Sequence, residues 1–516
     1  MELKKTVCYE DFGAVGDGVA NDCVAIRKAH EYANENGLDV VCNNGKTYYI
    51  GAMTKAIPIH TNVNWGNSTF IVDDSKITPN LEVDGIKIRG VAIFVLPSPG
   101  GMGPIEGLSE WKEKINAEGG LKRDTFKKID VNFGEMVLLR LFNDEHRNYI
   151  RYGVNQNSGA IQVETIVVDK DGNLDPNTPL IYDYDKVTRI EAYKIDVEPL
   201  VIEGGTFITY PFLTNEPQHY TAYGRNISCH RSNVTFRNIV HKLDKEGLYD
   251  YDANTGDYGC PYGGFFQSGL CNNVLYEGCT PAAHVAYKGF NGAGMGTYDI
   301  GASGTINLTY KNCAQEEGNF FNHGPASWRW GVMGSSGNKN VQFINSKLTR
   351  FDAHNGVHNV RLIGSDLRMV RTNGSGDFIM EDCKMYNRLL IGLREDYGGS
   401  LRGDIVIKNV TMDPGDVYPI LISNTWYNHY FGYPTFMPET ITIDNFQLTK
   451  GDEVHIFSPN LVKQLDNAWR DEIDGQPNVN KTVPPKKIII RNNKQGLKYI
   501  LPEGEYFKNT EIIIED

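Results

Sequence analysis

Residues 341–382 read VQFINSKLTRFDAHNGVHNVRLIGSDLRMVRTNGSGDFIMED, and this stretch decides the fold. Three phrases of one form start at Val341, Val360 and Phe378. Each phrase alternates apolar residues with variable ones and closes on Asn, Gly or Asp. Such alternation places every second side chain on one face of a β-strand, and the closing residue favours a bend. Each phrase is therefore expected to be a short strand followed by a turn.

The same phrase recurs on both sides of this stretch. Successive phrases start between 18 and 40 residues apart, which is typical of a solenoid whose coils carry loops of unequal length. The residues after the bends are small or apolar and are expected to stack in the interior. These residues are Ile239, Cys279, Cys313, Ser346, Ser365 and Cys383. The other phrases start at Val234, Val274, Leu308, Ile405 and Ile441.

The N-terminal segment predicts a cap for this solenoid. Residues 11–22 read DFGAVGDGVAND, and Ala25-Ile26 follows. Asn21 or Asp22 is suited to begin a helix that Gly37 ends. The segment resembles the N-terminal signature of the pectate-lyase-like superfamily, which includes polygalacturonase-type hydrolases, polysaccharide lyases and phage tailspikes. The resemblance implies an all-β fold, a right-handed parallel β-helix with an N-terminal capping helix, which acts on or binds a carbohydrate.

The repeat divides the chain into four parts. Residues 1–65 are expected to form the cap and the first coils. The phrase is lost over 66–205, which predicts an inserted β-rich subdomain with a helix around Trp111. Residues 206–483 are expected to form the coils that carry a groove, and 484–516 to add C-terminal strands that cover the open end.

Composition excludes several classes of partner and site. The net charge is −13 and no run of Lys or Arg occurs, which argues against a nucleic-acid partner. No stretch approaches the roughly 20 apolar residues of a membrane span. The nine cysteines form no CxxC pair, which argues against a zinc site or a disulfide framework. Met1 to Tyr9 lacks the apolar core of a signal peptide, so a cytoplasmic location is expected, or secretion if a leader was removed. The oligomeric state, monomer or homo-oligomer, stays open.

The three closely spaced phrases leave little room for loops and predict a bare wall of polar side chains. Counted from the bend residues, Asp352 and Arg371 share one offset, and Thr349, Arg368 and Tyr386 share another. Neighbouring coils lie about 4.8 Å apart, so residues at one offset become neighbours. Arg371 is expected to keep Asp352 ionised.

A catalytic site can be assigned on this wall. Asp352 would be the base and Asp396 the acid, about 10 Å apart along the axis, near the separation that inverting glycosidases need. His354 would relay a proton or bind a hydroxyl, beside Arg371. Predicted substrate-binding residues are basic, acidic or aromatic side chains on neighbouring coils: Arg350, Arg368, Arg394, Glu395, Trp328, Arg329, Trp330, His323 and His284. A structural role, as a surface ion pair or a buried loop anchor, is the competing interpretation of each.

No metal or other cofactor is expected from these residues. One segment, with Asp169, Asp171, Asn173 and Asp175, resembles a calcium loop. It has Leu180 where that loop carries a glutamate, so a hairpin turn on Asp171-Gly172 is favoured.

The predicted function is that of a glycoside hydrolase on a poly- or oligosaccharide. A polysaccharide lyase or uronan epimerase is the first alternative, and a tailspike-like or non-catalytic glycan-binding protein is the second. The Asn-Thr-Asp, Asp-Asp, Gly-His-Gly and Arg-Ile-Lys motifs of polygalacturonase-type hydrolases are absent; Asp352-Ala-His354-Asn-Gly356 is only a loose echo of them.

Overall fold

The computed structural model describes residues 6–148, 160–216, 222–247, 249–250, 253, 255–282, 287–288, 294–295, 298–321, 333–394, 400–423, 435–462, 472–473, 476–477 and 482–515. The chain forms two compact units. The first comprises Met1–Gly100, Ile195–Ala302 and Thr309–Gly334, and the second comprises Gly101–Lys194, Ser303–Leu308 and Ser335–Asp516.

The first unit begins with the predicted cap. Helix α1 (Cys23–Asn36) ends at Gly37, whose φ of 63° is left-handed. Beyond it lie parallel strands that pair in register. The main strands are β3 (Asp39–Val41), β4 (Thr47–Ile50), β6 (Val63–Asp73), β9 (Phe94–Leu96), β13 (Leu200–Tyr210), β15 (Ile227–Cys229), β16 (Val234–Arg237), β17 (Val240–Leu243), β21 (Phe266–Gly269), β22 (Asn272–Glu277) and β25 (Ile300–Ser303).

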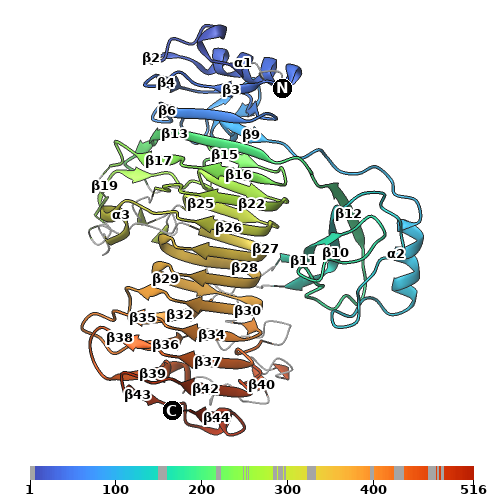
Figure 1. The fold of residues 1–516 in the computed structure, drawn as a ribbon, viewed down its shortest axis with the longest axis vertical. Coiled ribbons are helices and arrows are strands. Elements are labelled where there is room, and N and C mark those ends of the chain that lie inside the picture. The colour runs from blue at the N-terminus through green and yellow to red at the C-terminus, as the bar shows by residue number, and fades with distance from the viewer. Residues whose placement is uncertain are drawn as a thin grey trace, which may run out of the picture. The chain divides into compact units, whose positions relative to one another are not determined.

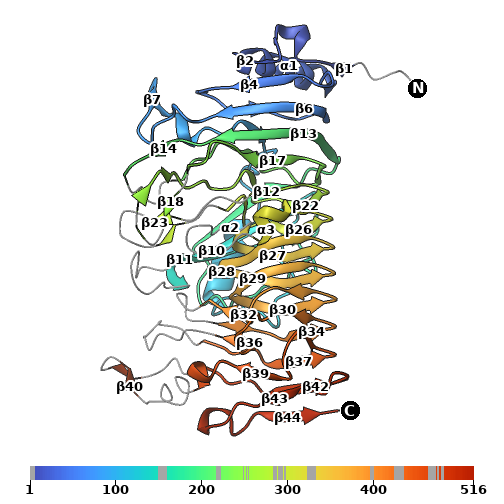
Figure 2. The same cartoon turned by 90° about the vertical axis from the view of Figure 1, so that its left-hand side faces the viewer.

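The second unit contains further parallel coils (Figures 1 and 2). Val360 pairs with Phe378, Phe378 with Ile405, and Ile405 with Ile441, so the repeat phrases stack as predicted. The main strands are β27 (Met333–Ile344), β28 (Lys347–Ile363), β29 (Asp366–Thr372), β30 (Gly374–Glu381), β32 (Leu389–Leu393), β34 (Ile405–Lys408), β36 (Ile420–Ser423), β37 (Thr440–Asp444), β39 (Glu453–Phe457), β42 (Lys487–Arg491) and β44 (Glu511–Ile514). Residues 303–308 include the start of β26 (Ile306–Lys311).

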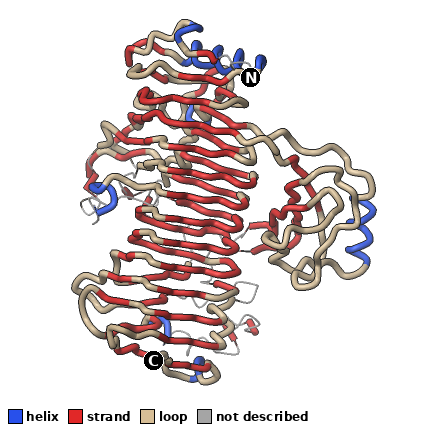
Figure 3. Tube along the Cα trace, viewed as in Figure 1, coloured by secondary structure: helices blue, strands red, loops and turns tan. Residues whose placement is uncertain are grey.

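The fold is the right-handed parallel β-helix that the sequence predicts. Strands dominate the described residues, as Figure 3 shows in red. In the part of the chain that the structure describes, no helix has both the length and the apolar character that a membrane span needs.

Asparagines make the bends between strands. Asn345, Asn409 and Asn445 have φ values near 50°, the left-handed region that Asn tolerates better than most residues. Asn445 Nδ2 donates to Asn409 Oδ1 at 2.8 Å, and Asn409 Nδ2 donates to Asp382 Oδ1 at 2.9 Å. This ladder of side chains satisfies polar groups from coil to coil.

The residues after the bends fill the interior, as predicted. Cys279, Cys313 and Cys383 are each at most 2% exposed, as are Ser346 and Ser365. All nine cysteines are free thiols. The late cysteines therefore serve as small core residues.

The insertion is shorter than the predicted range of 66–205. A separate antiparallel sheet of β10 (Val137–Asn148), β11 (Ala160–Val168) and β12 (Arg189–Lys194), with helix α2 (Leu108–Ala117), lies within Gly101–Lys194. Strands β6 and β13 belong to the parallel coils instead. Their sequences lack the repeat phrase because each strand turns at a glycine, Gly66 or Gly204, and continues as one strand.

The two predicted C-terminal strands are β42 and β44. Both continue the parallel ladder, with Ile441 opposite Ile488 and Ile488 opposite Ile512. They form further coils in the described C-terminal residues.

Candidate functional site

The predicted register of these strands is present in the second unit, but the wall is not bare, because Thr349, Arg350 and Asp352 are buried. Strands β28 and β29 pair in parallel with Asp352 opposite Arg371. The Phe351 ring lies against Phe343 and Phe378, with ring centroids 5.8 and 6.0 Å away. Because side chains alternate along a strand, Asp352 points away from the aromatic interior that holds Phe351.

Asp352 is fully buried although it points away from that interior. Arg350 donates to its Oδ2 atom and Arg394 donates to its Oδ1 atom. His354 Nε2 lies 3.6 Å from Oδ2. The Arg350 and Arg394 side chains are each 9% exposed, and the His354 side chain is 29% exposed. The carboxylate therefore lies beneath the cationic groups that bind it.

The charge state of Asp352 follows from these contacts. Burial alone would raise its pKa, but the guanidiniums of Arg350 and Arg394, together with His354, outweigh burial and hold the pKa well below its usual range. A carboxyl with this pKa is ionised and cannot serve as a proton donor near neutral pH. The sequence assigned this ionising effect to Arg371, whereas the contacts come from Arg350 and Arg394.

Two more arginines extend the cationic surface along the same strands. Arg371 follows Val370 on β29, and Arg368 lies three residues before Arg371 on the same strand. Burial lowers the pKa of Arg368 to about 10, which still leaves it protonated at neutral pH. Arg350, Arg368, Arg371 and Arg394 are called the arginine wall below. Two of its guanidiniums, those of Arg350 and Arg394, bind the buried carboxylate of Asp352, and Arg371 lies opposite Asp352 in the strand register.

The Arg368 ladder is also present. Leu348 pairs with Leu367, and Leu367 with Met385, so the next residues, Thr349, Arg368 and Tyr386, follow one another from coil to coil. The Tyr386 hydroxyl lies 3.4 Å from Asp366 Oδ2.

The remaining predicted site residues lie outside the described residues. These are Asp396, Glu395, His284, His323, Trp328, Arg329 and Trp330. Their assigned roles stay predictions.

A concave region, separate from the arginine wall, lies between the insertion and the coils of the second unit. It is a cleft of about 400 Å³, and its lining includes Pro176, Pro179, Gln342, His358, Arg361 and Asp377. Sequence reasoning missed this cleft. The repeats give the register of the coils, but they contain no signal for where the insertion docks.

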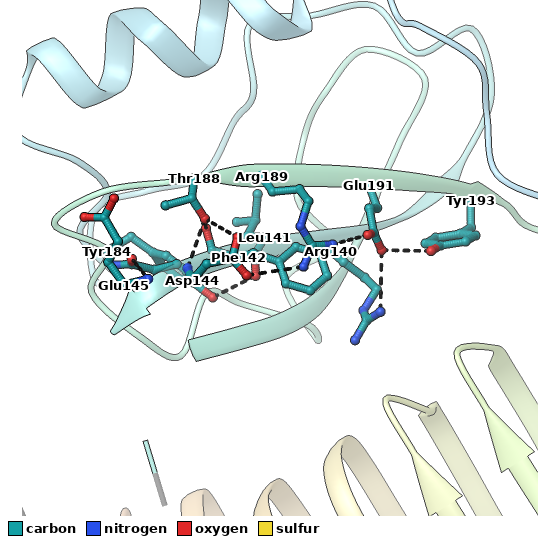
Figure 4. A network of polar contacts seen from close by, with 11 residues as sticks. Arg140, Leu141, Phe142, Asp144, Glu145, Tyr184, Thr188, Arg189, Glu191 and Tyr193 are labelled. Atoms are coloured by element: carbon teal, nitrogen blue, oxygen red, sulfur yellow. Dashed lines mark hydrogen bonds and ion pairs between the residues drawn. The ribbon is translucent and has the colours of Figure 1, made fainter. Parts of the chain in front are cut away.

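The insertion sheet carries its own cationic network (Figure 4). Glu191 accepts a hydrogen bond from the Tyr193 hydroxyl at 2.8 Å, contacts Arg140 Nη1 at 3.5 Å and pairs with Arg189. The Arg189 guanidinium lies 3.5 Å from the centroid of the Phe142 ring. Arg140 also lines a smaller cavity of about 140 Å³. The network fixes these side chains against the sheet.

The segment that resembles a calcium loop forms a hairpin turn. Gly172, with a φ of 86°, donates its amide to Asp169 O at 3.1 Å, and Asp169 N donates to Asn173 O at 2.9 Å. The Asp169 carboxylate accepts the amides of Asp171 and Asn173. These contacts agree with the favoured interpretation of a turn on Asp171-Gly172.

The sequence matches no protein-family model and no curated protein. Among solved structures, a tailspike of Pseudomonas phage phi297 is 11% identical, with a TM-score of 0.46, over 99% of this chain and 84% of that one. PfbA, a surface adhesin of Streptococcus pneumoniae, is 11% identical, with a TM-score of 0.39, over 99% and 92%. An exopolygalacturonase from Thermotoga maritima is 10% identical, with a TM-score of 0.33, over 100% and 93%.

Proposed function

We propose that this chain is a carbohydrate-active enzyme that cleaves an acidic poly- or oligosaccharide bound along the arginine wall. The observation that carries the proposal is the pairing of Arg350 and Arg394 with Asp352, together with Arg371 opposite Asp352 and Arg368 on the same strand as Arg371. Guanidinium groups bind carboxylates with matched geometry, so a row of them suits a uronic-acid polymer. Because the net charge is −13, such a ligand would be held by these local arginines against the repulsion of the overall field.

Hydrolysis is the reaction that the sequence favours. It needs one group to protonate the leaving oxygen and another to activate water. The depressed pKa of Asp352 suits only the ionised partner, and its burial beneath Arg350 and Arg394 makes it a positioning residue for those two guanidiniums. An acid at Asp396 would complete the hydrolase and stays a prediction.

Elimination is a second candidate, and one contact favours it. His354 lies beside Asp352, partly exposed, next to arginines. In elimination, a base removes the proton on the carbon next to the uronate carboxylate, the electron pair forms a carbon–carbon double bond, and the glycosidic oxygen leaves with the bonding pair. Arginines stabilise the charge that develops on the carboxylate, and an imidazole can take the proton.

One assay separates these reactions. The chain is incubated with polymers of uronic acids and with neutral polysaccharides, while reducing ends and ultraviolet absorbance are recorded. Hydrolysis of uronates releases reducing ends without absorbance, and elimination produces both. Arg371→Gln should reduce turnover at least tenfold, whereas Arg491→Gln, on a distant coil, should leave it unchanged. No cleavage of any uronate polymer would overturn the proposal, and binding without cleavage would indicate an adhesin-like protein.

A further inference from the structure

One side of the cleft between the insertion and the coils is formed by residues 176–179, called its roof below, and hydrogen bonds hold this segment in place. The Lys339 ammonium donates to Pro179 O at 2.7 Å and pairs with Glu164 at 2.8 Å, and both side chains are 1% exposed. Asn340 Nδ2 donates to Asn177 O at 2.9 Å. These bonds hold residues 176–179 over strands β27, β28 and β30. The cleft is therefore already formed in the free protein, as small-molecule sites usually are.

The asparagines that the coils contribute to the cleft lining form hydrogen bonds with one another. Asn340 Nδ2 also donates to Asn307 Oδ1 at 2.9 Å, and Asn359 Nδ2 donates to Asn340 Oδ1 at 3.0 Å. Asn359 Oδ1 accepts the amide of Asp377 at 2.9 Å. Their amides maintain the stacking of the coils, so recognition of a ligand falls to other lining side chains.

Those other side chains are polar but balanced in charge. Arg361 contributes one guanidinium and Asp377 one carboxyl, and Gln342 is neutral. His358 shares a hydrogen bond with Ser375 Oγ at 3.0 Å, and burial, helped by Lys339 and Arg123, lowers the pKa of His358 to about 3. The imidazole is therefore neutral near pH 7. Pro176, Pro179 and Ile379 add apolar surface between the polar groups.

We infer that this cleft is a second binding site, which takes a short neutral saccharide. A volume of about 400 Å³ lies in the range of small-ligand clefts. Hydroxyl groups both donate and accept, so they match the guanidinium, carboxyl, amide and imidazole of the lining. The apolar C–H faces of a sugar match the prolines and aliphatic side chains. The charge balance separates this cleft from the arginine wall, where an acidic ligand is proposed.

The test measures binding of neutral trisaccharides. Cellotriose, laminaritriose, maltotriose and mannotriose are each titrated into the full chain by calorimetry and by saturation-transfer NMR. Binding of at least one is expected, and Arg361→Ala and Gln342→Ala should each weaken it at least tenfold. Arg371→Gln, on the arginine wall, and Arg491→Gln should leave it unchanged.

The outcomes distinguish the two sites. Loss of neutral-sugar binding in the Arg361 and Gln342 variants, with uronate cleavage intact, supports a separate site. The inference is overturned if no neutral trisaccharide binds at millimolar concentration, or if the cleft variants bind as tightly as the unaltered chain. Circular dichroism and thermal unfolding test whether each variant is folded. If Gln342→Ala does not fold, Asp377→Asn replaces it as the second cleft variant.

Discussion

Asp352 is a carboxylate that is fully buried yet held in its ionised form by Arg350 and Arg394. Removing its charge leaves two nearly buried guanidiniums without this counterion. Breaking a buried ion pair from one side typically costs about 3–5 kcal/mol. Asp352→Asn is therefore expected to lower the free energy of unfolding at pH 7 by about that amount. Urea denaturation followed by circular dichroism measures the change.

The same pair gives a pH dependence with a defined sign. The pKa of Asp352 is depressed in the folded state, so its contribution to stability is present above the ordinary aspartate value of about 3.9 and is lost as the pH falls below it. The difference in stability between the unaltered chain and Asp352→Asn should shrink between pH 5 and pH 2. Asp452→Asn, at an exposed position, serves as the control. A difference that stays constant with pH would contradict the assignment.

The sequence predicts correctly that Arg371 lies opposite Asp352 in the strand register, but it misses the contact between Asp352 and Arg394. Asp352 and Arg371 each lie seven residues after their bend residues, Asn345 and Gly364, and they lie opposite each other in the parallel strands. In the next coil, Arg371 pairs with Gly392, ten residues after Asp382. The additional residues around Tyr386 shift the register, so simple counting could not bring Arg394 to Asp352. Counting from the bend residues predicts which residues lie opposite each other in coils of equal length. The count fails wherever a coil changes length.

At the scale of elements, the Lys339–Glu164 pair joins strand β27 to strand β11 of the insertion. Lys339→Ala should leave Glu164 buried without this partner and loosen the insertion by about 3–5 kcal/mol. Replacing both residues, as Lys339→Met with Glu164→Leu, should recover much of that loss. Hydrogen exchange measured by mass spectrometry over residues 101–194 reports the loosening.

Lys186→Ala is the matched control, because both side chains of the Lys186–Glu145 pair within the insertion are exposed. Exposed pairs contribute about 0–1 kcal/mol. Equal exchange rates in the Lys339 and Lys186 variants would show that the buried pair does not hold the insertion.

The N-terminal cap depends on one buried imidazole. His30 of α1 shares a hydrogen bond with the Tyr9 hydroxyl at 2.9 Å, and burial lowers the pKa of His30 to about 3. A histidine held neutral stabilises the fold above its ordinary pKa of about 6.5, and this contribution is lost as the pH falls toward 3. Exchange of the α1 amides should therefore accelerate between pH 7 and pH 4, after correction for intrinsic rates, and His30→Gln should remove most of that pH dependence. An unchanged dependence in the variant would exclude this histidine as the cause.

The sequence predicts the elements better than their docking. The alternating phrases indicate strands because each carries an apolar residue at every second position, and these residues are buried. Gly37 ends α1 as expected. The limits of the insertion were wrong because β6 and β13 turn at glycines instead of closing on asparagine. The roof of the cleft depends on contacts such as Asn177 with Asn340, 163 positions apart, which no local pattern encodes.

At the scale of the whole molecule, the proposed acidic ligand approaches a chain whose net charge is −13. The long-range field should repel a uronate oligomer, whereas the arginine wall attracts it at short range. The screening length falls from about 30 Å at 0.01 M salt to about 8 Å at 0.15 M salt. Salt in this range therefore weakens the distant repulsion more than the contacts at Arg350 and Arg394, which are nearly buried. The association rate of a trigalacturonate, measured by stopped flow, should rise a few-fold over this range, opposite to the usual behaviour of a cationic site. For a neutral trisaccharide the rate should stay constant, and a steep fall for the uronate would mean that the arginine wall dominates the field even at long range.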